Sequence, residues 1–378
     1  MDQIKEKFLI DPNTIFLNHG SYGACPRPVF EEYQKWQGIL ETQPVRFFKE
    51  TVYATLKDSR VALGKFVGCE EEELLFFQNP TTAISNVIYN LELNNKDEIL
   101  MTDHEYGALV RAWEAMGRRT GANIIQQNIP IGLSTEEDFI DAFWEGVTEN
   151  TKVIFISHIT SPTALIFPIK QIITRAKEKG IITIIDGAHV PGQLDLNIND
   201  LGCDFYTGAL HKWLCAPKGT SFLFVKKEHH AWMKPLVYSW GKDGDDPGPT
   251  KFLQDFQWQG TRDMSAFLTI PKAIDFYHEC IQPLQKNCLQ INLEAYSKFQ
   301  AILGTDPLSS GVGWLGQMVS HPLPHDIPKD IKDLLLKKHK IEIPIFEWNN
   351  LNLIRISIQV YNDRKDVESL MSALVSLN

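Results

Sequence analysis

The sequence predicts an α/β fold, with a mostly parallel sheet in a large domain and a smaller α+β domain at the C-terminal end. Short apolar runs alternate with segments of helical period through the first two thirds of the chain, which is typical of parallel sheets covered by helices. This alternation weakens after Gly241–Pro249, a segment rich in Gly, Pro and Asp that is expected to form an exposed loop. The length of 378 residues also favours more than one domain.

Six apolar runs rich in Ile, Val and Phe are the expected strands, namely Glu73–Phe77, Glu98–Met101, Ala122–Gln126, Val153–Ser157, Ile181–Asp186 and Ser221–Val225. Between them lie four expected helices, namely Thr82–Leu91, Gly107–Gly121, Thr135–Val147 and Ile169–Lys179. Loops that bind ligands gather at the carboxyl ends of the strands in such sheets. Residues that follow these strands are therefore the first candidates for a functional site.

Composition narrows the class of protein. A formal net charge of −10 argues against nucleic acid as the main partner, because phosphate backbones require a basic surface. No run approaches 18 apolar residues, and the first residues lack the apolar stretch of a signal peptide, so neither a membrane span nor secretion is expected. Six scattered cysteines without a CxxC pair are typical of reduced, cytoplasmic thiols.

The strand expected at Ile181–Asp186 ends in a carboxylate, which places Asp186 at the binding edge of the sheet. An Asp after a strand also suits a turn or a helix cap, so this residue alone leaves its role open. Lys212 lies 26 residues further along, between His211 and the apolar pair Trp213-Leu214. Burial disfavours an ammonium ion and lowers its pKa, which an amine nucleophile requires.

A third feature is the segment Gln78–Ala83, where a strand runs into the start of a helix. Thr81 and Thr82 offer hydroxyl groups beside free backbone N–H groups, a combination that binds phosphate, although a plain Thr cap has the same appearance. The P-loop pattern GxxxxGK[ST] is absent. An anion-binding helix start, an acid at a strand end and a sequestered lysine are together the parts that pyridoxal 5′-phosphate requires.

The chain resembles the aminotransferase class V family of pyridoxal phosphate enzymes, and within it the isopenicillin N epimerase-like branch. The motifs that carry this resemblance span nearly the whole chain. They are Asn18-His19-Gly20-Ser21-Tyr22-Gly23, Asn79-Pro80-Thr81-Thr82-Ala83, Asp103-His104-Glu105-Tyr106-Gly107-Ala108, Asp186-Gly187-Ala188-His189, His211-Lys212-Trp213, Gly260-Thr261-Arg262-Asp263 and Arg355-Ile356-Ser357.

The resemblance implies a fold of type I, with a mostly parallel seven-stranded sheet in a large domain at 26–258 and a small α+β domain at 259–378. Residues 1–25 are then an N-terminal segment that packs on the small domain or on a dimer interface. The implied assembly is a homodimer with shared active sites.

The resemblance also implies roles for individual residues. Lys212 resembles the Schiff-base lysine, Asp186 the partner of the pyridine nitrogen, and Tyr106 a ring that stacks on the cofactor and serves in catalysis. The remaining implied cofactor ligands are His189, Thr81, Thr82, Thr163, Thr207, His211, Gly260 and Thr261, the last two reaching a phosphate across the dimer interface. Arg355 resembles the clamp on the substrate carboxylate, because its planar fork donates two hydrogen bonds, and the loop of Tyr22 borders the substrate.

One position departs from the family pattern. Ala209, three residues before Lys212, often has a polar counterpart in the family, so one hydrogen bond to the cofactor is missing here or comes from Thr207. No metal is expected: His211 and Cys215 have suitable spacing but lack a second ligand pair, and the calcium-like segment after Asp243 lacks oxygen ligands at Pro247 and Gln254.

Three reactions on the Cα of an amino acid fit this set of residues. Epimerisation needs Lys212 on one face and a second acid or base on the other, for which Tyr106, His104 and a bound water are candidates. C–S lysis of the ergothioneine-pathway (cysteine sulfoxide) type needs Lys212 as base and a leaving group at Cβ, and transamination needs Lys212 to carry the proton from Cα to the cofactor. A cofactor-binding regulatory protein is the non-enzymatic alternative. Desulfuration through a persulfide is disfavoured, because Ser309–Leu351 contains no cysteine to serve as the mobile nucleophile. The likeness favours the epimerase.

Overall fold

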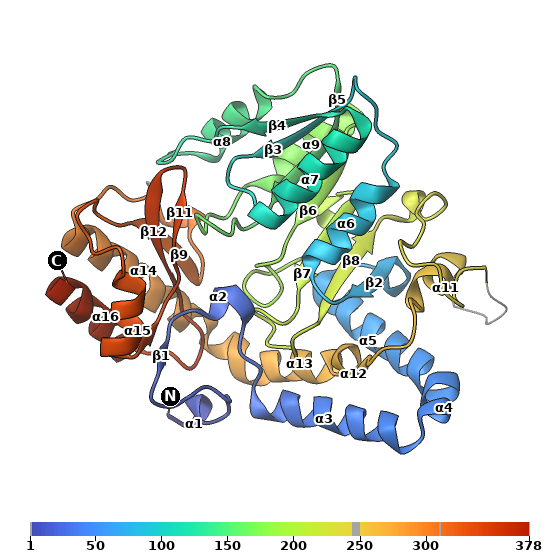
Figure 1. Ribbon diagram of the computed structural model, residues 1–378, viewed down its shortest axis with the longest axis horizontal. Helices are drawn as coiled ribbons and strands as arrows, with labels where there is room; N and C mark the ends of the chain where they lie inside the picture. Colours follow the sequence, from blue (N-terminus) through green and yellow to red (C-terminus); the bar gives the residue numbers. More distant parts are fainter. Residues whose placement is uncertain (1, 244–249, 310, 378) are drawn as a thin grey trace.

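The computed structural model describes residues 2–243, 250–309 and 311–377, and its centre is a seven-stranded sheet (Figure 1). The strand order is β2-β8-β7-β6-β5-β3-β4, and β8 alone runs antiparallel to its neighbours. The predicted mostly parallel α/β sheet is therefore confirmed. Its strands are β2 (Leu74–Phe77), β3 (Glu98–Thr102), β4 (Asn123–Gln127), β5 (Thr151–Ser157), β6 (Ile182–Asp186), β7 (Phe205–Ala209) and β8 (Ser221–Val225).

One strand of the sheet, β7, was not among the predicted ones. Its sequence FYTGA carries a glycine and a threonine and lacks the apolar run of the other strands. Gly208 is required by packing, since a Cβ there would lie 2.5 Å from the ring of Phe222 and 2.6 Å from Pro191. The apolar pattern of an ordinary strand is therefore absent from β7, because Phe222 and Pro191 approach its backbone too closely for a side chain at position 208.

Helices cover both faces of the sheet, and the strands have the alternating pattern that this requires. In β5, Val153 and Phe155 pack in the cluster beneath α6 and α7, whereas Ile154 and Ile156 pack in the cluster that includes α5, α8 and α9. These helices are α5 (Val52–Val67), α6 (Pro80–Asn90), α7 (Gly107–Thr120), α8 (Glu136–Trp144), α9 (Ile169–Glu178) and, on the face of α6 and α7, α11 (Lys251–Gln257).

A three-stranded antiparallel sheet, ordered β11-β12-β9, forms the centre of the C-terminal part. Its strands are β9 (Met318–Pro322), β11 (Ile345–Trp348) and β12 (Leu351–Ser357), and it is accompanied by α14 (Gln285–Leu303), α15 (Ile331–His339) and α16 (Arg364–Leu377) (Figure 1). The connection from the large sheet passes through α12 (Ser265–Leu268) and α13 (Ile270–Phe276). Most of the loop predicted at Gly241–Pro249 lies outside the described residues.

The N-terminal segment pairs with the C-terminal part of the chain. Strand β1 (Ile15–Phe16) runs parallel to β10 (Ile341–Glu342), and Asn18 forms a further bridge to Ser357. The segment continues into α2 (His19–Tyr22) and α3 (Arg27–Thr42). Shorter helical turns are α1 (Asp2–Lys5), α4 (Pro44–Arg46), η1 (Phe47–Thr51), η2 (Glu71–Glu73), α10 (Ile198–Leu201), η3 (Lys227–His229), η4 (Tyr277–Ile281), η5 (Gln282–Leu284) and η6 (Val312–Trp314). Within the described ranges, no helix is long and apolar enough to cross a membrane.

Candidate active site

A cavity of about 660 Å³ lies where the loops that follow the parallel strands meet α2 and β12. Strand ends of the large sheet, the N-terminal segment and the C-terminal sheet all contribute to its walls. The lining residues are Gly20, Ser21, Tyr22, Gln78, Asn79, Pro80, Thr81, Thr82, Tyr106, Ser157, Ile159, Ser161, Asp186, Ala188, His189, His211, Lys212, Lys218, Gly219 and Arg355. Nine of the predicted site residues are thus brought together, namely Tyr22, Thr81, Thr82, Tyr106, Asp186, His189, His211, Lys212 and Arg355.

Asp186 is the last residue of β6 and is buried, with 4% of its surface exposed. Its Oδ1 accepts a hydrogen bond of 2.9 Å from the N–H of Ala188. Burial raises the pKa of the carboxyl, and this bond and the charge of Lys212 oppose the increase. Gly187 must lack a side chain, because a Cβ would lie 2.2 Å from the ring of Tyr206. The carboxylate is therefore held in a fixed place with a lone pair available for a cationic partner.

Lys212 reaches the same cavity from the loop after β7, and its Nζ lies 3.0 Å from Nε2 of His189. Burial and the charge of Arg355 together lower the pKa of Lys212 to about 7, against the opposing effect of Asp186. Burial also holds the pKa of His189 well below its ordinary value. Because Nδ1 of this neutral ring accepts the indole N–H of Trp213 at 3.4 Å, its own proton lies on Nε2 and is donated to the lysine amine.

Thr81 and Thr82 lie in the first turn of α6, as the sequence predicts. Asn79 caps this helix, and its Oδ1 accepts from both the N–H and the hydroxyl of Thr82, at 2.9 and 3.1 Å. His211 lies nearby, and its Nδ1 donates to the carbonyl of Thr220 at 3.1 Å. Because burial lowers the pKa of His211 to about 4, its Nε2 is a donor only when an anion draws a second proton onto the ring.

Arg355 extends from β12 and is a buried cation in the wall of the cavity. Its Nη1 donates to the carbonyl and the hydroxyl of Ser161, at 2.5 and 3.2 Å, and its Nη2 donates to the hydroxyl of Ser21 at 3.0 Å. Burial lowers its pKa only to about 10, so the guanidinium stays charged at neutral pH. Among the described residues it has no carboxylate within salt-bridge distance, and its Nε is buried without a partner. The site thus holds a charge that an anionic ligand would neutralise.

Two tyrosines flank this arginine and open toward solvent. Tyr22 is 73% exposed and Tyr106 46% exposed, and both interact electrostatically with the guanidinium of Arg355. Their hydroxyl groups are the acid or base groups that this wall of the cavity presents to a bound molecule.

Four predicted cofactor ligands do not line the cavity. The hydroxyl of Thr163 bonds Nδ1 of His104 and the hydroxyl of Thr160, both at 2.7 Å, and the hydroxyl of Thr207 donates to the carbonyl of Phe222 at 2.7 Å. Gly260 and Thr261 follow α11 and lie outside the cavity of this single chain, and their predicted partner is the cavity of a second subunit.

His104, a candidate for the second acid or base, is also outside the cavity. It is completely buried, with Nε2 bonded to the carbonyl of Ile129 at 3.1 Å and the ring 4.5 Å from that of Trp348. His104 therefore does not line the cavity, because its ring packs against Trp348 of the C-terminal sheet.

Glu105 is a residue that the sequence analysis did not single out. It lies beside Tyr106, is 6% exposed, and accepts from the hydroxyl of Thr102 at 2.7 Å and the N–H of Ser157 at 3.2 Å. The second oxygen lies 2.5 Å from the hydroxyl of Ser157. Burial raises the pKa of this carboxyl to about 7. Its neighbours in the sequence are polar, so no apolar pattern signals that it is buried.

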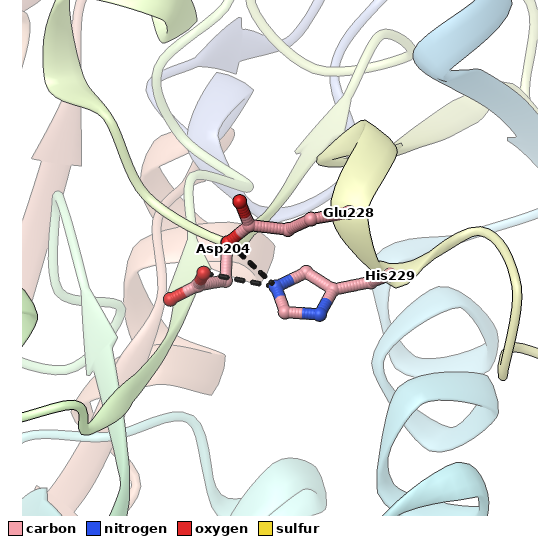
Figure 2. A group of neighbouring side chains, drawn as sticks. All are labelled: Asp204, Glu228 and His229. Carbon is pink, nitrogen blue, oxygen red and sulfur yellow. Dashed lines mark hydrogen bonds and ion pairs between the residues drawn. The ribbon is translucent and has the colours of Figure 1, made fainter.

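Asp204, Glu228 and His229 form the one cluster within the described residues with the spacing of metal ligands (Figure 2). Asp204 precedes β7, at the opposite edge of the sheet from Asp186. Nδ1 of His229 accepts the indole N–H of Trp232 at 3.2 Å, so Nε2 carries the proton and donates to Asp204 at 2.9 Å. Lys226 already pairs with Glu228 at 2.8 Å.

The bonds of Asp204 show what this cluster does. Its second carboxylate oxygen accepts the N–H and hydroxyl of Thr183 at 2.8 Å each, which links the start of β7 to β6. Nε2 of His229, both oxygens of Asp204 and Oε1 of Glu228 are thus already bonded, and through Asp204 the arrangement acts as a hydrogen-bonded staple between strands.

The family described as aminotransferase class-V matches residues 26–370. The chain is 29% identical to the isopenicillin N epimerase of Amycolatopsis lactamdurans, over 99% of this chain and 98% of that one. It is 26% identical to a probable chloroplastic L-cysteine desulfhydrase of Arabidopsis thaliana, over 97% and 83% of the two chains.

Among solved structures, a C-DES variant with glycine covalently linked to its pyridoxal phosphate cofactor superposes with a TM-score of 0.86 at 17% identity. The match covers 97% of both chains. At this identity the match establishes the fold, which is the one that the resemblance implied. Since the family match takes in most of the chain, from the residue before α3 into α16, the protein belongs to the aminotransferase class-V family.

Proposed function

We propose that this protein is a pyridoxal phosphate-dependent enzyme that acts on the Cα of an amino acid, in the manner of the isopenicillin N epimerases. The observation that carries the proposal is the presence of Lys212, Asp186 and Arg355 in one cavity, with no carboxylate among the described residues forming an ion pair with Lys212 or Arg355. The homology to isopenicillin N epimerases over the full length of both chains supports it.

The residues of the cavity fit this cofactor. Lys212 has a low pKa and so would supply a neutral amine to the aldehyde of pyridoxal phosphate at physiological pH. Asp186, buried and bonded to a single backbone N–H, is suited to a protonated pyridine nitrogen. The first turn of α6, with Thr81 and Thr82, offers a helix N-terminus to a phosphate. When bound, pyridoxal phosphate withdraws electrons from the substrate's Cα and makes its bonds labile.

Separate residues of the chain bind the substrate, remove the Cα proton and return a proton. The guanidinium of Arg355 binds the substrate carboxylate and orients Cα, because its Nε is free and its two terminal nitrogens are held by Ser161 and Ser21. The amine of Lys212 takes the proton from Cα, and His189 holds that amine in place through its Nε2. For a change of configuration, a proton must return from the other face, and Tyr106 and Tyr22 are the cavity residues that carry a suitable hydroxyl.

Two other reactions of the family use the same residues. The similarity to plant cysteine desulfhydrases supports C–S lysis as the second candidate, in which Lys212 is the base and a thiol leaves from Cβ. Transamination would require Lys212 to carry the proton to the cofactor. A regulatory protein that only binds the cofactor has no need of a buried, unpaired Arg355.

The experiment that separates these reactions incubates the enzyme and pyridoxal phosphate with a panel of amino acids in D₂O. Epimerisation is expected to place deuterium at Cα of one substrate and to bring its L and D forms to equilibrium, measured by mass spectrometry and chiral chromatography. Release of pyruvate with a thiol would establish lysis instead, and dependence on a keto acid would establish transamination. If no amino acid exchanges its Cα proton, the enzymatic proposal fails.

Replacing Arg355 by Ala is expected to raise KM for the amino acid about 10²-fold, with a smaller change in kcat, because the clamp binds substrate and transition state alike. Steady-state kinetics on the substrate found in D₂O measure this directly. Arg364→Ala, which removes an exposed arginine paired with Glu294, is the matched control. Equal losses in kcat and no change in KM would contradict the assignment of a carboxylate clamp.

We further propose a homodimer in the cytoplasm, with a large domain at 26–258 and a small one at 259–378. Thr261 is exposed in the single chain and Gly260 has a φ of 101°, which suits a loop that approaches a neighbouring subunit's phosphate. All six cysteines are free thiols, in keeping with a reducing compartment. Residues 15–18 pair with strands of the small domain, which supports a role for the N-terminal segment as its extension.

A further inference from the structure

The backbone around Lys212 is held by the N-terminal segment, although the two are almost two hundred residues apart in sequence. Nε2 of His19 donates to the carbonyl of Lys212 at 3.0 Å, and the same carbonyl accepts the N–H of Cys215 at 3.0 Å. Gly23 lies against this loop so closely that a Cβ would be 1.9 Å from the carbonyl oxygen of His211. The loop that contains Lys212 is thus contacted at two points by His19 and Gly23, which belong to one short segment.

The protons in this arrangement can be assigned from the partners. His19 is completely buried, and burial lowers its pKa to about 3, so the ring is neutral and carries one proton. A carbonyl only accepts, so this proton lies on Nε2, toward Lys212. The other nitrogen, Nδ1, accepts the hydroxyl proton of Tyr361 at 2.9 Å, and burial holds the pKa of that phenol well above its ordinary value. The pair therefore has one hydrogen-bonding state at neutral pH.

Tyr361 and the segment around His19 both belong, by their contacts, to the C-terminal part of the protein. Leu17 accepts the N–H of Ser357 at 3.0 Å, and Phe16 accepts from the side chain of Asn362 at 3.0 Å. At Gly20 a Cβ would lie 2.5 Å from the sulfur of Met318, so α2 is packed directly on this sheet. The segment from β1 to α2 is thus fixed to the C-terminal sheet and reaches across to the lysine loop.

The same short helix contacts Arg355, since its Ser21 accepts from Nη2 of that residue. One turn of helix therefore links the carboxylate clamp, through Ser21, and the catalytic lysine, through His19. We propose that His19, braced by Tyr361, is a positioning residue that sets the placement of the Lys212 amine relative to a substrate held by Arg355. This inference rests on the proposed function and assigns a role to a residue that touches neither cofactor nor substrate.

The test compares His19→Phe with the wild-type protein, both loaded with pyridoxal phosphate. A phenyl ring fills the same space but cannot donate to the Lys212 carbonyl. We expect kcat to fall about 10- to 10²-fold, because a small misplacement of a reacting group has effects of that size, while KM changes little. The visible circular dichroism of the bound cofactor should also weaken, since it reports how firmly the ring is oriented.

Two further variants make the result specific. His19→Gln offers an amide N–H to Lys212 and an oxygen to Tyr361, and is expected to restore most of both signals. His321→Phe is the matched control, because His321 is equally buried in β9 but bonds only the hydroxyl of Thr305, at 3.0 Å, away from the cavity. It should lower the melting temperature without changing the circular dichroism of the cofactor.

The inference is overturned if His19→Phe matches His321→Phe in kcat and in circular dichroism, or if His19→Gln gives no recovery. Failure of the proposed function has a different signature, since wild-type protein would then show no visible absorption band with pyridoxal phosphate and no turnover.

Discussion

Replacing Lys212 by Ala is expected to abolish the visible absorption of the protein–cofactor complex and to lower turnover by at least about 10³-fold. The substitution removes both the amine that bonds the cofactor and the base that moves the Cα proton, and general acid–base catalysis alone accounts for factors of this size. The fold should survive, because the loop around Lys212 is held by its backbone carbonyl and not by the amine. Absorption spectra after gel filtration, together with the Cα exchange assay, measure both effects.

A chemical label distinguishes this lysine from its neighbours. Borohydride reduction of the wild-type complex should attach the cofactor irreversibly to the peptide containing Lys212, as identified by mass spectrometry, and should leave Lys212→Ala unlabelled. Lys337→Ala, which removes an exposed lysine paired with Asp333 on α15, is the matched control and should behave as wild type. Label on another lysine, such as Lys218 in the same cavity wall, would show that the assignment of Lys212 is wrong.

Replacing Asp186 by Asn is expected to differ from Lys212→Ala: the cofactor should stay bound, whereas turnover should fall. The amide oxygen can still accept the N–H of Ala188, but the negative charge is gone. A neighbouring carboxylate raises the pKa of a cationic partner by about 1–3 units, or roughly 1.4–4 kcal/mol, so the rate should fall about 10- to 10³-fold. Attachment of the cofactor to Lys212 should persist, because Asp186 raises the pKa of that amine and its removal leaves more of it neutral.

Spectroscopic titration and kinetics check this prediction together. The bound cofactor of Asp186→Asn should lose the pH dependence that arises from its ring nitrogen, while retaining its visible band. Asp275→Asn, a change at an exposed position of α13, serves as the control. Unchanged turnover in Asp186→Asn would mean that this carboxylate is not the partner of the ring nitrogen, and loss of the band would mean that it is needed for attachment.

The elements that follow local rules were predictable. Strand β6 is an apolar run of β-branched residues, so its end, and with it Asp186, could be placed from the sequence to within one residue. The helix predicted at Gly107 begins there as α7, whereas the helix predicted from Thr82 begins two residues earlier, at Pro80 of α6. Strand β7 was not predicted, because Gly208 is required by close packing and interrupts the apolar pattern.

Contacts between distant segments could not be predicted. Nothing near Arg355 in the sequence indicates that Ser161 and Ser21 hold its guanidinium, because three separate segments meet there only in the folded chain. Similarly, Thr163 has the expected residue type for a cofactor ligand, yet its hydroxyl is taken up by His104 and Thr160. Residue type indicates what a side chain can bond, whereas the choice among possible partners is made by tertiary packing.

The staple of Asp204 and His229 has a consequence for how this protein can change. Asp204 ties β6 to β7 at the end of the strands away from the cavity through three hydrogen bonds with Thr183, and His229 donates to its other carboxylate oxygen; none of these bonds involves a residue of the site. Substitutions around Tyr22 and Tyr106 therefore leave the bonds that align these two strands intact. Substitutions that create a new activity usually lower the folding stability of a protein. Because these hydrogen bonds lie outside the site, such substitutions leave them in place, and the chain can remain folded while residues around the cavity change the reaction.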